Sequence, residues 1–313
     1  MIPMNSRERL FTALKCREPD RPPHFELEFQ IVEEAFGLSY PPGELWVGSS
    51  AERQQAYEMA LAVYRRILEN YQWDALPVIS GSHDYDFYTF LRAELGAKLP
   101  LAGMIWQSTI SLENIDDWMA FSSDLFEHPK RLHERARAFM DYSLLRAREL
   151  VDAGCDFIIV PNDIAYNEGP FMSPGQMDEF VFDYMSELVN FVKGQGLPII
   201  LHSDGDLRMS LDRLMDLGFD GIQSIDPIAG MDLAEIKQLS EGRLALMGNV
   251  DCGALHAGPL AKIEASARYA LKHGPPGGGY IYSSSNTIFQ GVPLAHYEKM
   301  IEIYREHYPL SDP

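Results

Sequence analysis

Cysteine and long apolar runs are both scarce in this chain. Three cysteines, Cys16, Cys155 and Cys252, are spread over 313 residues without a CxxC pair. An odd and scattered set argues against a disulfide framework and for a reducing compartment, so we expect a cytoplasmic protein. No apolar segment approaches the roughly 18 residues that a membrane-spanning helix needs. Residues 1–10 are too polar to resemble a signal or transit peptide, and we expect no membrane partner.

Positive charge is scarce as well. The chain has 26 Lys and Arg residues against 46 Asp and Glu residues, which gives a net charge of −20. Nucleic acids and anionic membranes need a cationic surface, so neither is expected as a partner. The same charge works against a polyanionic substrate unless arginines cluster locally.

The sequence has no internal repeat, and no GxGxxG motif follows an early strand. Apolar segments with polar ends instead alternate with amphipathic stretches of helical length. Eight such segments, each taken with its polar end, are predicted strands: residues 23–28, 74–79, 103–107, 157–163, 199–206, 221–226, 244–251 and 280–286. Helices are predicted near residues 50–71, 129–153, 173–193, 207–217, 232–239, 260–273 and 293–308.

This alternation predicts an α/β protein with one domain. We expect a single (β/α)8 TIM barrel over residues 1–313, with a short N-terminal helical extension that begins near Asn5. An open doubly wound sheet is the alternative fold. Trp106 and Trp118 are expected in the core.

Polar residues gather where the predicted strands end. The apolar run 199–201 leads into His202 and Asp204, and Asp163 and Asn286 follow two other strands. Because the carboxyl ends of parallel barrel strands meet at one mouth, we expect these side chains to form an acid–base or metal site there. His202, Asp204, Asp163 and Asn286 are therefore candidate catalytic residues.

Several segments together resemble the uroporphyrinogen decarboxylase superfamily, which also contains corrinoid-dependent methyltransferases. They are residues 6–9, 18–23, 163–166, 169–174, 202–205, 229–233 and 246–251. The resemblance runs from end to end and implies a barrel enzyme with a small-molecule substrate. It leaves a homodimer open as the assembly state.

The decarboxylase branch carries arginines at the end of its first strand and a histidine after its last strand. Here Glu26 and Glu28 occupy the first position and Asn286 the second. Two carboxylates would repel a porphyrinogen with many carboxylates. Asp74 does match the central aspartate of the decarboxylases, and the resemblance therefore adds Asp74 to the candidate catalytic residues. Decarboxylation of a tetrapyrrole or smaller acid, with no cofactor, is therefore the alternative function.

The methyltransferase branch often carries His-x-Cys-Gly and a later cysteine, which bind zinc. The matching positions here are His202, Asp204 and Asn286, so oxygen-bearing residues replace both cysteines. His nitrogen and carboxylate oxygen still suit zinc or another divalent metal. His202, Asp204 and Glu168 are the predicted metal ligands, with Asp163 as a further candidate. The preferred function is methyl transfer from an O- or N-methyl small molecule to a corrinoid carried by a partner protein.

Five further residues are predicted to bind the substrate. Glu26 and Glu28 alternate with apolar residues on the first strand, and Tyr166 offers a hydroxyl in the loop after Asp163. Arg208 follows the Asp204 turn, and Asn249 ends the seventh strand. A non-catalytic ligand-binding relative is the third functional alternative.

Overall fold

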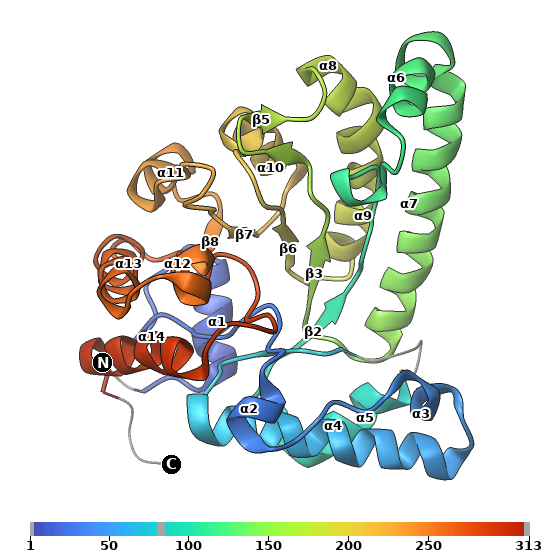
Figure 1. The fold of residues 1–313 in the computed structure, drawn as a ribbon. Coiled ribbons are helices and arrows are strands. Elements are labelled where there is room, and N and C mark those ends of the chain that lie inside the picture. The colour runs from blue at the N-terminus through green and yellow to red at the C-terminus, as the bar shows by residue number, and fades with distance from the viewer. Residues whose placement is uncertain (1–2, 80–84, 310–313) are drawn as a thin grey trace.

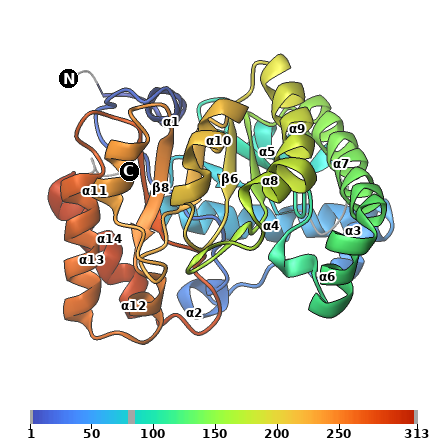
Figure 2. The same cartoon turned by 90° about the horizontal axis from the view of Figure 1, so that it is seen from above.

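A parallel sheet forms the centre of the molecule. The structure, a computed structural model, describes residues 3–79 and 85–309. In these residues seven strands pair in parallel, in the order β1 (Leu76–Pro77), β2 (Leu101–Met104), β3 (Phe157–Pro161), β6 (Ile199–His202), β7 (Gly221–Ser224), β8 (Ala245–Val250) and β9 (Tyr280–Ser284). The sheet curls and helices cover its outer face (Figures 1 and 2). The predicted α/β barrel is confirmed.

Helices follow the strands, and five of them, at residues 32–36, 43–47, 86–95, 118–127 and 252–257, were not predicted from the sequence pattern. The helices are α1 (Ser6–Leu14), α2 (Val32–Phe36), α3 (Gly43–Val47), α4 (Ser50–Tyr71), α5 (Asp86–Leu95), α6 (Trp118–Glu127), α7 (Pro129–Asp152), α8 (Pro174–Met177), α9 (Asp183–Gly194), α10 (Leu211–Leu217), α11 (Leu233–Leu239), α12 (Cys252–Ala257), α13 (Leu260–His273) and α14 (Leu294–His307). Capping boxes begin three of them: Asn5 pairs with Glu8 at α1, Ser49 with Glu52 at α4, and Ser173 with Gln176 at α8.

The predicted first strand, residues 23–28, is wrong as a regular strand. The described residues form isolated bridges here instead of a continuous ladder, at His24 with Tyr282 and, one residue beyond the predicted strand, at Phe29 with Ile288. The reason lies in its side chains, because the backbone N–H of Ser284 donates to the carboxylate of Glu26 (2.9 Å) instead of to a backbone carbonyl. The segment still occupies the eighth position of the barrel. Its Pro23 carbonyl accepts from Tyr282 N (2.9 Å), and its His24 carbonyl accepts from Asp74 N (2.7 Å), just before β1.

Two other strand predictions needed adjustment. Only Leu76–Pro77 of residues 74–79 forms β1, and β2 begins two residues before the predicted segment, at Leu101. The loop after β3 contains a small antiparallel hairpin that the pattern did not predict, β4 (Ala165–Tyr166) with β5 (Gly169–Pro170).

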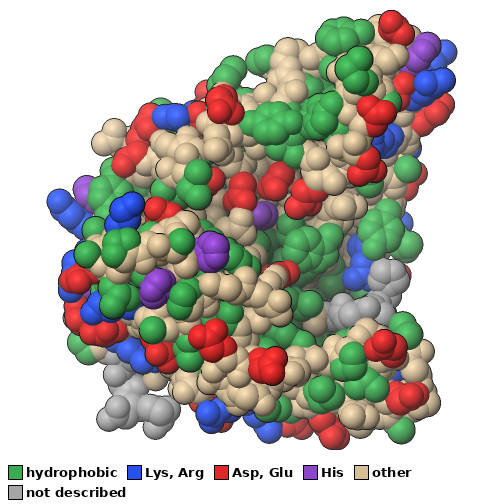
Figure 3. All heavy atoms as spheres, viewed as in Figure 1, with side chains coloured by type: hydrophobic (Ala, Val, Ile, Leu, Met, Phe, Trp, Pro, Cys, Tyr) green, Lys and Arg blue, Asp and Glu red, His purple; other side chains and the backbone are tan. Residues whose placement is uncertain are grey.

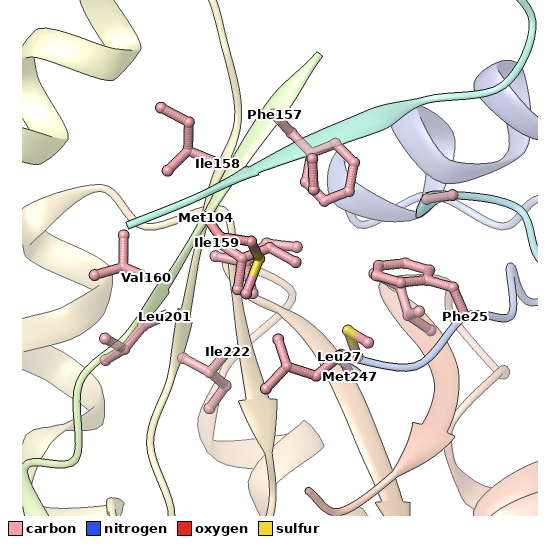
Figure 4. Packing of buried hydrophobic residues seen from close by; sticks show 14 of the residues in the cluster. Phe25, Leu27, Met104, Phe157, Ile158, Ile159, Val160, Leu201, Ile222 and Met247 are labelled. Atoms are coloured by element: carbon pink, nitrogen blue, oxygen red, sulfur yellow. The ribbon is translucent and has the colours of Figure 1, made fainter. Parts of the chain in front are cut away.

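Buried apolar side chains fill the barrel. Phe25, Leu27, Met104, Phe157 and Met247 belong to one cluster drawn from three strands and the 23–29 segment (Figure 4). Residues alternate along each strand, so the side chain after a core residue faces the helices. No helix within the described residues combines the length and the apolar character that crossing a membrane requires.

Candidate functional site

His202 ends β6 with its imidazole held from one side. Its backbone pairs in register with Gln223 of β7, and its Nδ1 donates a hydrogen bond to Gln223 Oε1. The amide nitrogen of Gln223 donates to the carbonyls of Ser284 (3.3 Å) and Asn286 (3.1 Å), which turns Oε1 toward the histidine. Because Oε1 can only accept, Nδ1 carries a proton in this arrangement, and Nε2 is the ring nitrogen left to offer a lone pair to a metal.

Two carboxylates lie beside that lone pair. Nε2 of His202 is 3.9 Å from Oδ1 of Asp163, which follows β3. The same Asp163 oxygen accepts from the backbone N–H of Asp204 (2.9 Å), so the turn after β6 is tied to the loop after β3. One ligand atom from each of Asp163, His202 and Asp204 lies within 4.8 Å of the others. An imidazole nitrogen and two carboxylates are donors that a divalent cation accepts.

The carboxylate of Asp204 is oriented from the neighbouring strand ends. Its Oδ1 accepts from the hydroxyl of Ser224 (2.7 Å), and its Oδ2 accepts from the side-chain amide of Asn286. The structure thus brings together, at the carboxyl ends of the strands, four of the predicted residues: His202, Asp163, Asp204 and Asn286. Figure 3 shows acidic side chains and a histidine around a hollow on this face.

The carboxyl groups of this site lie close enough to perturb one another. Burial raises the pKa of Asp204, and the neighbouring Asp163 and Asp226 raise it further, against the opposing effects of His202 and Ser224. Burial is also the main cause that raises the pKa of Asp226. The pKa of Glu113 is raised by burial and by Asp163. A positive charge bound among these groups would relieve their repulsion.

A cavity of about 430 Å³ opens next to Asp204 and Asn286. Its walls also include Asp226, Ile228, Cys252 and Phe289. Cys252 is buried, and burial raises its thiol pKa to about 12, with the nearby acids adding to the effect. This thiol is therefore a poor thiolate ligand at neutral pH.

Glu26 lies inside the barrel with one oxygen satisfied and one without a partner. Its Oε2 accepts three hydrogen bonds, from Ser283 Oγ (2.8 Å), Ser284 Oγ (2.7 Å) and Ser284 N (2.9 Å). Its Oε1 is buried and has no hydrogen-bond partner. Burial raises the pKa of Glu26 to about 7 in spite of these donors.

Asp74 is not brought to this group. It precedes β1, at the amino ends of the strands, and it is fully buried. Arg9 Nη1 (2.7 Å) and Arg21 Nη1 (2.6 Å) bind its two oxygens, and His24 N donates to it as well (2.9 Å). The Arg9–Asp74–Arg21 cluster ties helix α1 and the 18–24 segment to the base of the barrel.

The remaining predicted residues lie around the mouth with partners of their own. Glu28 accepts from the side chain of Gln30 (2.6 Å), and Asn249 donates to the carbonyls of Ile225 and Met231. Arg208 is exposed and pairs with Asp206 (2.8 Å) and Glu235 (3.4 Å).

The hairpin after β3 carries the last two predicted residues. Glu168 is exposed there and is not part of the Asp163–His202–Asp204 group. The ring of Tyr166 packs at 5.9 Å from that of Trp118. The prediction that Trp106 and Trp118 are core residues is wrong, because 44% and 39% of their surfaces are exposed.

Sequence reasoning missed four residues of the site: Gln223, Ser224, Asp226 and Glu113. The first three stand in the predicted strand 221–226, and a polar Gln inside that apolar segment was the available signal. Glu113 lies in η1 (Leu112–Asn114), a short 3-10 turn after β2 that no pattern marked.

Comparison with known proteins places this geometry in a family. The chain matches the sequence model of the family described as "Uroporphyrinogen decarboxylase (URO-D)" over residues 65–307. It is 28% identical over 225 residues to the Methylcobamide:CoM methyltransferase MtaA of Methanosarcina barkeri, covering 70% of this chain and 61% of that protein. It is 29% identical over 274 residues to the uroporphyrinogen decarboxylase of Ralstonia nicotianae, covering 82% of this chain and 70% of the relative.

A solved structure shares the whole fold. A methyltransferase from Methanosarcina mazei superimposes with a TM-score of 0.74 at 18% identity, over 97% of this chain and 99% of that one. At this identity the likeness concerns the fold alone. The family match covers most of the chain, and relatives with both methyltransferase and decarboxylase names align with it. The chain therefore belongs to the uroporphyrinogen decarboxylase (URO-D) family.

Proposed function

We propose that this protein is a methyltransferase that moves a methyl group from an O- or N-methyl small molecule to a corrinoid held by a partner protein. The observation that carries the proposal is the Asp163–His202–Asp204 group at the barrel mouth, with Nε2 of His202 free and facing a carboxylate. The similarity to a methylcobamide-using methyltransferase supports a corrinoid partner.

The site's residues fit a divalent metal such as zinc. His202, Asp163 and Asp204 would hold the ion, and Gln223 would keep the imidazole in the tautomer that ligates through Nε2. A bound ion would act as a Lewis acid on the heteroatom that carries the methyl group. Asn286 and Ser224 keep the Asp204 carboxylate turned toward the group. Asp163 takes the place that sequence reasoning gave to Glu168.

Decarboxylation through Asp74 has less support. Asp74 lies at the opposite end of the strands and both its oxygens are occupied by arginines, so no substrate ring nitrogen has access to it there. The cavity beside Asp204 has no Lys or Arg among its described lining residues, whereas a polycarboxylate substrate needs cations.

An anaerobic assay with free cob(I)alamin tests the proposal. Wild-type protein supplied with zinc should form methylcobalamin from O- or N-methyl donors, measured by its absorption spectrum. His202→Ala should lower the rate by roughly 100-fold or more, since the metal ligand is lost. If wild type forms methylcobalamin no faster than a reaction without protein, and releases carbon dioxide from uroporphyrinogen, the result would contradict the proposal and favour a decarboxylase.

A further inference from the structure

The cavity beside Asp204 has a distinctive charge pattern. Asp226 and Asp204 lie in its wall, and none of its described lining residues is Lys or Arg. Arg208, the cation expected to bind a substrate carboxylate, is paired with Asp206 and Glu235. A ligand with a carboxylate or sulfonate would therefore meet like charge, with no Lys or Arg in the described lining to balance it.

Asp226 is fixed in its position. Its Oδ1 accepts from the backbone N–H of Ile228 (2.9 Å), and the backbone N–H groups of Gly205 and Ala229 also favour its charged form. Only 8% of its surface is exposed. A carboxylate held by backbone donors, buried and beside a cavity, is a preorganised partner for a positive group.

Other walls of the same cavity are apolar. Ile228 and the half-buried ring of Phe289 line it, and the Phe289 ring packs at 5.2 Å from that of His256. An aromatic face attracts a cation whose charge is spread over methyl groups, because such an ion is weakly hydrated and fits against a ring. Carboxylates and an aromatic ring, with no Lys or Arg among the described lining residues, together describe a site for a methylated ammonium.

We propose that this cavity binds a small molecule bearing a methylated ammonium group, held by Asp226 and Phe289 beside the Asp163–His202–Asp204 group. This inference rests on the proposed function and narrows its methyl donor from an O- or N-methyl compound to a cationic N-methyl compound. The volume of about 430 Å³ accommodates a molecule of this size.

Calorimetric titration of the full chain with three ligands of one shape tests the charge preference. Choline is the cation, 3,3-dimethylbutan-1-ol is its neutral isostere, and 3,3-dimethylbutanoate is the anion. Choline should bind at least about tenfold more tightly than the neutral isostere, and the anion should not bind. Equal or tighter binding of either of the other two would overturn the inference.

Variants assign the binding to this cavity. Asp226→Asn keeps an oxygen for the backbone donors but removes the charge, and Phe289→Leu removes the aromatic ring. Each single variant should weaken choline binding by about tenfold and should change the affinity for the neutral isostere by less than about twofold. Asp212→Asn removes the same charge from the exposed face of α10 and should change neither. Choline binding that is unaffected by Asp226→Asn and Phe289→Leu would contradict the proposal.

The outcomes separate this inference from the proposed function. Methyl transfer from neutral ethers, with no preference for cations, would overturn the inference and leave the methyltransferase in place. Choline binding at this cavity by a protein that forms no methylcobalamin would support the cation site and count against the methyltransferase.

Discussion

His202 and Gln223 are direct cross-strand partners at the ends of β6 and β7, and the hydrogen bond from Nδ1 to Oε1 sets which imidazole nitrogen faces Asp163. The side-chain amide of the glutamine is itself fixed by two backbone carbonyls, those of Ser284 at the end of β9 and of Asn286 just after it. Three strand ends thus cooperate to present one lone pair. The site's chemistry depends on that orientation.

Replacing Gln223 by leucine should weaken zinc binding by about 10- to 100-fold, because the oxygen that accepts from Nδ1 and orients the histidine is lost. Gln223→Glu retains an acceptor and should bind zinc at least as well as wild type. Isothermal titration with zinc measures both. Gln195→Leu, at an exposed position after α9, is the control and should match wild type. Equal zinc affinity in Gln223→Leu and wild type would remove Gln223 from the site.

Glu26 should make the free energy of unfolding depend on pH. Its folded pKa of about 7 lies above the ordinary value of 4.5, so the folded state holds its proton more tightly than the unfolded state does. This contribution to stability is fully present below about pH 4.5 and is lost as the pH rises through about 7, a loss on the order of 3 kcal/mol.

Glu26→Gln tests this prediction. The amide keeps an oxygen for Ser283 and Ser284 and cannot ionise, so the variant should gain stability relative to wild type as the pH rises from 5 to 8. Urea denaturation at several pH values measures the difference between the two proteins. A difference that stays constant over this range would show that Glu26 does not titrate in it.

Asp74→Asn should destabilise the fold by roughly 3–5 kcal/mol, because two arginines lose the buried charge that they share. The folded variant should bind zinc as wild type does, since Asp74 lies at the other end of the strands. Chemical denaturation and zinc titration check the two parts. Asp141→Asn breaks an exposed pair with Arg137 (3.2 Å) and should cost less than about 1 kcal/mol. Loss of zinc binding in folded Asp74→Asn would contradict the placement.

The barrel and half of its site were predictable from local pattern. Apolar segments that end in polar residues located β3, β6 and β9, and parallel pairing then brought Asp163, His202 and Asn286 to one edge. Strand alternation could not locate Glu26, because its carboxylate replaces a backbone acceptor and breaks the ladder that the pattern assumed. Asp74 became a candidate through its match to the central aspartate of the decarboxylases, and the sequence pattern could not reveal its ion partners, Arg9 and Arg21, because both are distant in the sequence.

Gln223 and Asp226 show a different limit. Which polar residue of a strand meets His202 depends on strand order and register, and neither is encoded locally. Glu168 and Asp163 are close in sequence, yet the β4–β5 hairpin directs the first to solvent while the second stays beside His202.

Zinc titration of wild type and His202→Ala tests the central claim most directly, with His133→Ala as the control, since His133 is a half-exposed histidine of α7 that pairs with Glu179 (3.1 Å). The account predicts one tight zinc site per chain in wild type and in His133→Ala, and its loss in His202→Ala. The same zinc stoichiometry and affinity in all three proteins would contradict a metal site built on Asp163, His202 and Asp204.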